Sequence, residues 1–271
     1  MQDKISLAGD LGGGKSTVAN ILIDRLGAEY YSTGAIVRSI AESRGMTVGE
    51  LNKYMETHPE IDHEIDEGIA ALSEDERFLI IDSRMAWHFT KGTFKVYLSC
   101  DIETSALRIM HANRKGEHNS TLEETIDCTR SRRESEKKRY TEQYGVDIKD
   151  LSNYSLIVDT TVATPEQIAD RIAESFAIWQ QDKSYTRVYL SPERLHFPER
   201  ELDGDMLSPL ASKLEGGAEL TDITVCERDG EFYLVDGFES AMAYVFAFST
   251  FIPARHILRS EERRVGKECR S

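Results

Sequence analysis

Short apolar runs alternate with amphipathic segments along the first two-thirds of the chain. The segments between the runs carry apolar residues at helical spacing, as Ile61, Ile65 and Ile69 do. Runs that are apolar throughout are typical of strands buried on both faces of a parallel sheet. The alternation predicts an α/β fold of three layers, in which helices cover both faces of a parallel five-stranded sheet. The runs expected to form its strands lie at residues 5–8, 28–31, 78–82, 94–98 and 155–160.

A glycine-rich loop joins the first run to the first helix. Residues 9–17 read GDLGGGKST and fit the pattern G-x-x-x-x-G-K-[ST], which predicts a P-loop NTPase fold. Glycines let such a loop curl until successive N–H groups face one concavity, and the helix N-terminus adds partial positive charge. Lys15 is expected to reach the phosphates of ATP, and Ser16 to offer its hydroxyl to Mg²⁺. The residues expected to hold the ATP phosphates are Gly9, Gly12, Gly13, Gly14, Lys15, Ser16 and Thr17.

The alternative for this loop is a glycine-rich turn that binds no ligand. The strand before it and the helix after it disfavour that alternative, as do the lysine and the hydroxyl at the required positions. The loop therefore predicts nucleotide binding, without indicating a second substrate.

Polar residues also follow the second run. Thr33 and Gly34 stand at its end, and Arg38 lies one helical turn further on. An arginine so placed can hold a phosphate group through two parallel hydrogen bonds. A capped helix with a solvated arginine explains the segment equally well.

A carboxylate ends the third run. Asp82 is expected beside the glycine loop, because the carboxyl ends of parallel strands meet at one edge of the sheet. There it would contribute to the water shell of Mg²⁺ or orient an attacking oxygen. Arg84 follows at the same edge as another candidate phosphate ligand. A cap at the strand end is the alternative for Asp82.

Residues 122–144 are expected to form one long charged helix. Arg132, Glu136 and Arg139 are spaced four and three apart, which places them on one face. Arginines there could neutralise phosphates, and the carboxylate could accept a hydrogen bond from an exocyclic amine such as that of cytosine. A ladder of salt bridges on a solvated helix is the alternative, and the charge pattern alone favours it.

The motifs together resemble the cytidylate kinases, nearest to the archaeal-type, cytidylate-kinase-like branch. The resemblance covers residues 3–178 and implies a nucleoside monophosphate kinase that uses ATP and Mg²⁺. It departs from the family pattern at Asp10 and Leu11 within the loop and at Ser83, where glycine is usual. The segments that carry it are residues 9–17, 32–38, 58–66, 81–84, 132–147 and 158–161.

Composition changes after the predicted kinase domain, which spans residues 1–180. Residues 187–192 lead into an acidic, loop-like stretch, after which a helix, a hairpin and an aromatic helix are expected. Residues 185–258 are predicted as a small α+β domain that resembles the ParB/sulfiredoxin-like fold. The turn at Gly237 lacks the basic residues with which that fold binds phosphates. A degenerate binding or packing module is therefore favoured over a second active site.

The last residues need a separate interpretation. Residues 259–271 resemble the translation of a sequencing-library adapter, which predicts that native sequence ends at about Leu258. An ordinary charged tail is the alternative.

Charge and cysteine content narrow the class of protein. The formal net charge is −15, which disfavours binding along a nucleic-acid backbone. We found no membrane span and no signal-peptide pattern. Cys100, Cys128, Cys226 and Cys269 lack the spacing of a metal site or a disulfide framework. We expect a cytoplasmic protein whose partners are small-molecule nucleotides, with no nucleic acid and no membrane. The sequence does not indicate the oligomeric state, and a monomer is compatible with it.

The predicted reaction is transfer of the γ-phosphoryl group of ATP to a nucleoside monophosphate, with CMP or dCMP favoured as acceptor. Glu136 is expected to help read the base. The alternatives are a P-loop kinase for another small-molecule acceptor and a non-catalytic NTP-sensing binding protein. The predicted catalytic residues are Lys15, Asp82, Arg132 and Arg139. The predicted acceptor ligands are Thr33, Gly34, Arg38, Arg84 and Glu136.

Overall fold

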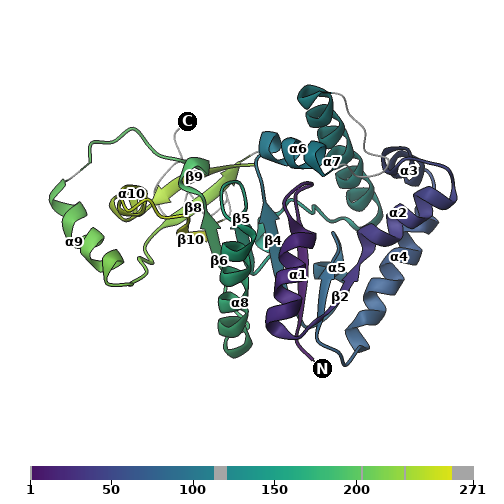
Figure 1. The fold of residues 1–271 in the computed structure, drawn as a ribbon, viewed down its shortest axis with the longest axis horizontal. Coiled ribbons are helices and arrows are strands. Elements are labelled where there is room, and N and C mark those ends of the chain that lie inside the picture. The colour runs from purple at the N-terminus through teal and green to yellow at the C-terminus, as the bar shows by residue number, and fades with distance from the viewer. Residues whose placement is uncertain (1, 113–120, 203, 229, 258–271) are drawn as a thin grey trace.

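The computed structural model describes residues 2–112, 121–202, 204–228 and 230–257. Within these residues one sheet of ten strands runs through the molecule in the order β2-β3-β1-β4-β5-β6-β10-β8-β9-β7. Helices flank the sheet, and in Figure 1 the C-terminal strands and helices lie at the left and α2, α3 and α4 at the right. The two ends of the sheet therefore carry different parts of the chain.

The first five strands along the chain are all parallel. β1 is central, and its Ile5 pairs with Ile80 on one side and with Phe94 on the other. Every residue of β1, β3 and β5 is buried, as expected of strands covered on both faces. The predicted parallel five-stranded sheet is confirmed. Its strands, in spatial order, are β2 (Glu29–Ser32), β3 (Leu79–Asp82), β1 (Lys4–Gly9), β4 (Thr93–Ser99) and β5 (Leu156–Asp159).

Two helices pack together on one face of this sheet. They are α1 (Lys15–Leu26) and α8 (Pro165–Gln181), and their apolar stripes bury Leu22 and Ile172 in one cluster. Thr164 caps α8, because its hydroxyl accepts from a backbone N–H of the first turn. The opposite face carries α5 (Ala86–Phe89) and the turn η2 (Leu151–Asn153).

A group of helices stands beyond the edge strand β2. Leu51, Met55 and Ile61 form a small apolar cluster among them, and Thr47 and Glu50 form a capping box at the start of one helix. The helices are α2 (Thr33–Ser43), α3 (Val48–Met55), α4 (Pro59–Ala71) and the turn η1 (Leu72–Glu74). The long helix α7 (Leu122–Tyr144) packs on α3 and on α6 (Ile102–His111). It therefore bridges the helices before β3 and the helix after β4.

The sheet continues past β5 into the C-terminal segment. β6 (Arg187–Leu190) pairs parallel with β5, although the sequence indicated only a lead into a loop there. The crossover through α8 returns the chain in the direction that parallel pairing requires. Apolar residues from both parts, including Tyr97, Tyr154 and Val188, share one buried cluster. The division into two domains near residue 185 stays a prediction, and the sheet runs through it without a break.

The remaining elements extend this sheet or cover it. The predicted hairpin is confirmed as β8 paired antiparallel with β9, and β10 pairs antiparallel with β6. The elements are η3 (Pro192–Arg194), β7 (Leu195–His196), α9 (Gly204–Glu215), β8 (Thr224–Arg228), β9 (Glu231–Asp236), α10 (Phe238–Phe246) and β10 (Ile252–His256). The C-terminal segment therefore combines strands and helices, as predicted.

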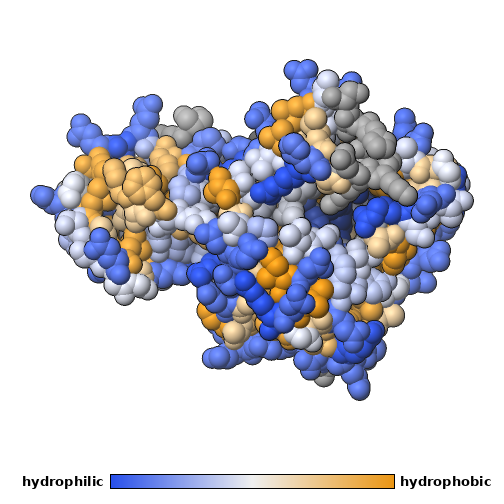
Figure 2. Space-filling view, viewed as in Figure 1, coloured by the Kyte–Doolittle hydropathy of each residue, from blue (hydrophilic) through white to orange (hydrophobic). Residues whose placement is uncertain are grey.

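The outer surface of the C-terminal segment is apolar in part. Figure 2 shows apolar side chains gathered over α9 and α10. Phe248 is 95% exposed, whereas Tyr244 on α10 is buried. Among the described helices, none combines the length and the apolar composition of a membrane span. The cytoplasmic location stays a prediction, and the adapter-like tail at residues 259–271 lies outside the described residues.

Candidate active site

The loop between β1 and α1 curls around a hollow at the carboxyl edge of the sheet. Gly14 is the N-cap of α1 and has a φ of 79°, and the space that a side chain would occupy there is open. Gly9 has a φ of 144°, and a Cβ on it would lie 2.4 Å from the carbonyl oxygen of Leu98. Glycine is therefore required at both positions. The loop forms the open backbone cradle that a phosphate group needs at a helix N-terminus.

The ammonium of Lys15 lies against this cradle. Its Nζ donates to the carbonyl oxygens of Gly9 at 3.0 Å and of Asp10 at 2.8 Å. Burial and then the charge of Arg84 lower the pKa of Lys15 to about 8, against the opposing effect of nearby carboxylates. At neutral pH the side chain is therefore predominantly charged, and it is positioned to attract an anion.

Ser16 and Asp82 face each other at the edge of the cradle. The hydroxyl of Ser16 donates to Oδ2 of Asp82 at 3.4 Å, and the hydroxyl of Tyr30 donates to the same atom at 2.8 Å. No cluster of three or more His, Cys, Asp or Glu side chains that could hold a metal occurs among the residues described. One hydroxyl and one carboxylate suit Mg²⁺, which usually keeps waters and binds phosphate oxygens. The residues therefore fit a magnesium ion that arrives with a nucleotide.

The cradle opens into a pocket of about 440 Å³ that collects most of the predicted site residues. They come from β3, α1, α2, α7 and the adjoining loops, while Gly9 lies behind the loop and outside the lining. Their individual roles stay predictions. The predicted residues that line the pocket are Gly12, Gly13, Gly14, Lys15, Ser16, Thr17, Thr33, Gly34, Arg38, Asp82, Arg84, Arg132, Glu136 and Arg139.

A row of alternating charges crosses this pocket. Nε of Arg84 forms an ion pair with one carboxylate oxygen of Glu136, and Nε of Arg132 donates to the other at 3.2 Å. Burial raises the pKa of Glu136, but the charges of Arg84, Arg132 and Arg139 outweigh it and hold the pKa below its usual value. Glu136 is 4% exposed, so it does not belong to a solvated ladder. It fixes two guanidinium groups that line the pocket.

Arg38 stands apart from this row. It lies on α2, is exposed and lines the same pocket. Within the described part of the chain, no carboxylate lies at ion-pair distance from its guanidinium. An arginine without a carboxylate partner, in a pocket that also contains a phosphate-binding cradle, is available to an anionic ligand.

Arg139 occupies a different position from its two neighbours on α7. Its Nη1 contacts both carboxylate oxygens of Asp62, at 3.0 and 2.7 Å, and its Nη2 donates to Asn52 at 3.0 Å. Arg139 and Asp62 are 3% and 4% exposed as side chains. The sequence predicted Arg139 as a catalytic residue, and that role stays a prediction. The observed contacts instead connect α7 with α3 and α4.

Known sequences match the part of the chain that holds this pocket. The model of the cytidylate kinase-like family matches residues 4–162, which is more than half of the chain. The chain belongs to the cytidylate kinase-like family. This membership confirms the resemblance found in the sequence, and it confirms the predicted enzyme class, the nucleoside monophosphate kinases.

Several relatives share this part of the chain. Cytidylate kinase from Thermoplasma volcanium is 34% identical over 187 residues, which cover 68% of this chain and 96% of that protein. Cytidylate kinase from Pyrococcus furiosus is 37% identical over 166 residues, which cover 60% of this chain and 83% of that protein. An S-adenosylmethionine-dependent nucleotide dehydratase from Lacinutrix mariniflava is 36% identical over 177 residues, which cover 65% of this chain and 36% of that protein. The match thus spans about a third of the dehydratase.

Solved structures are similar at lower levels. Shikimate kinase from Bacteroides thetaiotaomicron covers 65% of this chain with 17% identity and a TM-score of 0.46. Sulfiredoxin from Arabidopsis thaliana covers 31% of this chain with 19% identity and a TM-score of 0.27.

The sequence predicted no individual role for two carboxylates of α4, although both lie in the segment 58–66 that carries the family resemblance. Asp62 and Asp66 both line the pocket and are buried. Burial raises the pKa of Asp66 to about 6, and its Oδ2 atom has no hydrogen-bond partner among the described residues. Nε of Arg139 is likewise buried without an acceptor. The available signal was the four-residue spacing of the two carboxylates beside the apolar stripe of Ile61 and Ile65.

Proposed function

We propose that the chain transfers the γ-phosphoryl group of ATP to a nucleoside monophosphate, with CMP or dCMP as the acceptor. An oxygen of the acceptor phosphate attacks the γ-phosphorus as the bond to ADP breaks, so no covalent enzyme intermediate is needed. The observation that carries the proposal is a single pocket with a phosphate cradle at one end and arginines at the other. The relatives named cytidylate kinase support the choice of acceptor.

The donor end of the pocket holds the triphosphate. Backbone N–H groups of the loop and the ammonium of Lys15 bind its phosphates. Ser16, and Asp82 through water, would hold Mg²⁺, and the ion would neutralise phosphate charge. Apolar residues that line the pocket beside Arg108, including Ala163 and Pro165, are suited to the base of ATP.

The acceptor end neutralises and orients the second phosphate. Arg38 and Arg84 hold the acceptor phosphate, and Arg132 faces the transferring group. Both oxygens of Glu136 are engaged by arginines, which favours a role in orienting them over the base contact expected from the sequence. The enzyme thus provides fixed charge and alignment, the two contributions that phosphoryl transfer requires.

The base of the acceptor is read by Asp66 and Arg139. Cytosine carries an amino group that donates and a ring nitrogen that accepts. The free Oδ2 of Asp66 is an acceptor, and the free Nε–H of Arg139 is a donor, so the two complement that edge. Uracil presents an acceptor and a donor in the reverse order. The pair therefore supports cytosine over uracil.

Asp66→Asn is expected to lower the preference for CMP over UMP by about 10²-fold, because the amide can present a donor to uracil where the carboxylate cannot. The ratio of kcat/KM for the two acceptors measures this. Glu67→Gln is the matched control, since it makes the same change at the adjacent exposed position. An unchanged ratio in Asp66→Asn would remove this residue from base recognition.

The same preference is expected to fall as pH is lowered through about 6. Below that pH Asp66 binds a proton and becomes able to donate to uracil. The groups that set this pKa besides burial are Asp62 and His63 on α4 and Arg139 and Tyr144 on α7. Measuring both acceptors from pH 5 to pH 8 tests it. A ratio that stays constant across this range would contradict the assignment.

Two other functions use the same observations differently. A kinase for another small-molecule acceptor would use the same phosphate cradle but bind a different molecule at the acceptor end of the pocket. A non-catalytic NTP-sensing protein would use the C-terminal segment as its output. A coupled ADP-release assay with CMP, dCMP, UMP and AMP separates them. Turnover with CMP or dCMP supports the proposal. ATP binding without turnover of any of the four monophosphates would instead support the NTP-sensing function.

A further inference from the structure

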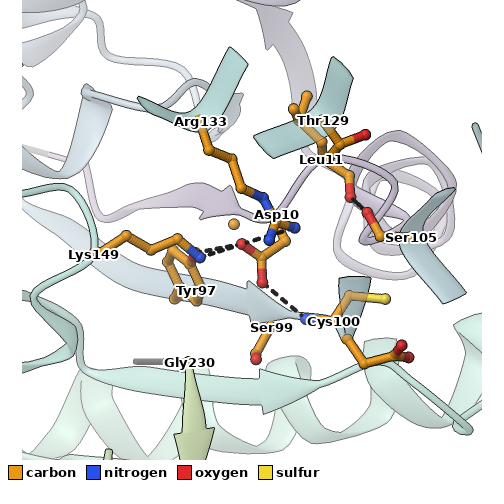
Figure 3. Close-up of polar contacts among 12 residues, drawn as sticks. Asp10, Leu11, Tyr97, Ser99, Cys100, Ser105, Thr129, Arg133, Lys149 and Gly230 are labelled. Atoms are coloured by element: carbon orange, nitrogen blue, oxygen red, sulfur yellow. Dashed lines mark hydrogen bonds and ion pairs between the residues drawn. The ribbon is translucent and has the colours of Figure 1, made fainter. Parts of the chain in front are cut away.

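Asp10 departs from the family pattern of the loop, and none of the roles assigned above uses it. Its side chain is directed away from the nucleotide pocket and is 5% exposed. It lines two cavities behind the loop, of about 120 and 630 Å³. Figure 3 shows its carboxylate with Lys149 and Arg133 on one side and the backbone of Cys100 on the other.

Donors from several segments converge on this carboxylate. Oδ1 accepts from the hydroxyl of Tyr97 at 2.9 Å and from Nζ of Lys149, and Nη2 of Arg133 lies 3.4 Å from it. Oδ2 accepts from the backbone N–H of Cys100 at 3.0 Å. Burial raises the pKa of Asp10, but the charges of Lys149 and Arg133 and the hydrogen bonds outweigh it and lower the pKa to about 2. The group is therefore ionised at every pH of practical use.

The backbone of the same residue positions the lysine of the cradle. The carbonyl oxygen of Asp10 accepts from Nζ of Lys15 at 2.8 Å and from the N–H of Gly13 at 3.1 Å. The N–H of Asp10 donates to Leu98 of β4 at 2.9 Å. Movement of this peptide would move the acceptor that holds the ammonium of Lys15.

Helix α7 reaches the loop from two sides. Arg133 follows Arg132 directly, yet Arg132 lines the nucleotide pocket and Arg133 lines the cavities behind the loop. On the pocket side, Glu136 pairs with Arg84, whose Nη1 donates to the carbonyl oxygen of Gly9 at 3.2 Å. On the far side, Arg133 contacts Asp10. The position of α7 and the shape of the loop are therefore linked.

We propose that Asp10 is a positioning residue that fastens the phosphate loop to α7 and so fixes Lys15 for the donor phosphates. The inference rests on the proposed use of ATP and is independent of the acceptor. Asp10→Asn keeps the shape of the side chain but leaves Lys149 and Arg133 without their counter-charge. A displacement of about 1 Å in a reacting group costs about 10²-fold in rate, so even a small shift of the loop is measurable.

Asp10→Asn is expected to weaken ATP affinity, measured by calorimetry, by about 10-fold or more. It should lower kcat/KM for ATP to a similar extent and leave KM for CMP within about twofold of the wild type. If Asp10 had only a structural role, Asp10→Asn would have a lower Tm, and the ATP affinity of the folded variant would equal that of the wild type. Glu56→Gln is the matched control, because Glu56 pairs with Lys138 of α7 away from the loop.

Lys149→Gln serves as a second variant, since it removes one of the two positive charges that face the same carboxylate without placing an amide inside the loop. It should also weaken ATP affinity. Wild-type affinity in folded Asp10→Asn, or in Lys149→Gln if Asp10→Asn does not fold, overturns the proposal. A wild-type protein that binds ATP and phosphorylates no monophosphate would contradict the proposed function, and the affinity measurements would still decide the role of Asp10.

Discussion

Replacing Lys15 with methionine is expected to lower kcat/KM for ATP by about 10³-fold or more. Methionine is similar in length to lysine but has no charge and no donor, so the cradle loses the group that neutralises the phosphates. A factor of 10³ corresponds to about 4 kcal/mol of lost transition-state stabilisation. Steady-state kinetics with ATP as the varied substrate measure the effect.

Two controls make this result specific. Lys91→Met makes the same change on an exposed residue in the turn before β4 and should behave as the wild type. Near-ultraviolet circular dichroism should confirm that Lys15→Met is folded. A rate within about tenfold of the wild type would mean that Lys15 does not stabilise the transferring phosphoryl group.

The pH dependence of the wild type should report the same side chain. Lys15 has a pKa of about 8, below that of a free lysine, so it loses its charge as pH rises through 8. We therefore expect kcat/KM for ATP to decline above that pH, since this parameter follows ionisations of the free enzyme. A kcat/KM for ATP that stays constant up to pH 9.5 would mean that the reaction with ATP does not depend on the charge of Lys15.

Arg132→Ala should mainly lower kcat and Arg139→Ala should mainly lower stability, although both residues lie on one face of α7. Arg132→Ala removes a charge that faces the transferring group and should lower kcat by about 10²-fold to 10³-fold with little loss of stability. Arg139→Ala leaves the buried Asp62 without its charged partner and should cost about 3–5 kcal/mol of unfolding free energy.

Thermal denaturation and kinetics on the two variants separate these effects. Arg139→Ala should lower Tm by roughly 10 °C, given the unfolding entropy of a chain of this size. Arg132→Ala should melt near the wild-type temperature. Equal loss of stability in both variants would contradict the distinct environments of the two arginines.

The core of the fold could be predicted because its signals are local. Apart from the edge strand β2, each strand of the parallel sheet is a short, mostly apolar run. Each covering helix has a periodic apolar stripe, so these elements follow from nearest neighbours in sequence. The extension of the sheet through β6 could not be predicted in the same way. The segment Arg187–Leu190 is short and leads into a loop. Its pairing with β5 depends on where α8 returns the chain.

The site was predictable to the same extent. The cradle residues and Asp82 follow from a motif and a strand end, whose positions parallel topology fixes. Asp62 and Asp66 were missed because carboxylates on a charged helix are usually solvated, and only the packing of α7 buries them. Asp10 was noticed only as a departure from a pattern. Its partners Arg133 and Lys149 lie more than a hundred residues away in sequence.

We infer that a donor and an acceptor nucleotide meet in one pocket. Phosphorus NMR of the full chain with ATP, Mg²⁺ and CMP tests it most directly, because it identifies the product that receives the phosphoryl group. We expect ADP and CDP to appear in equal amounts without inorganic phosphate. Unchanged ATP, or ADP accompanied by inorganic phosphate and no CDP, would contradict it.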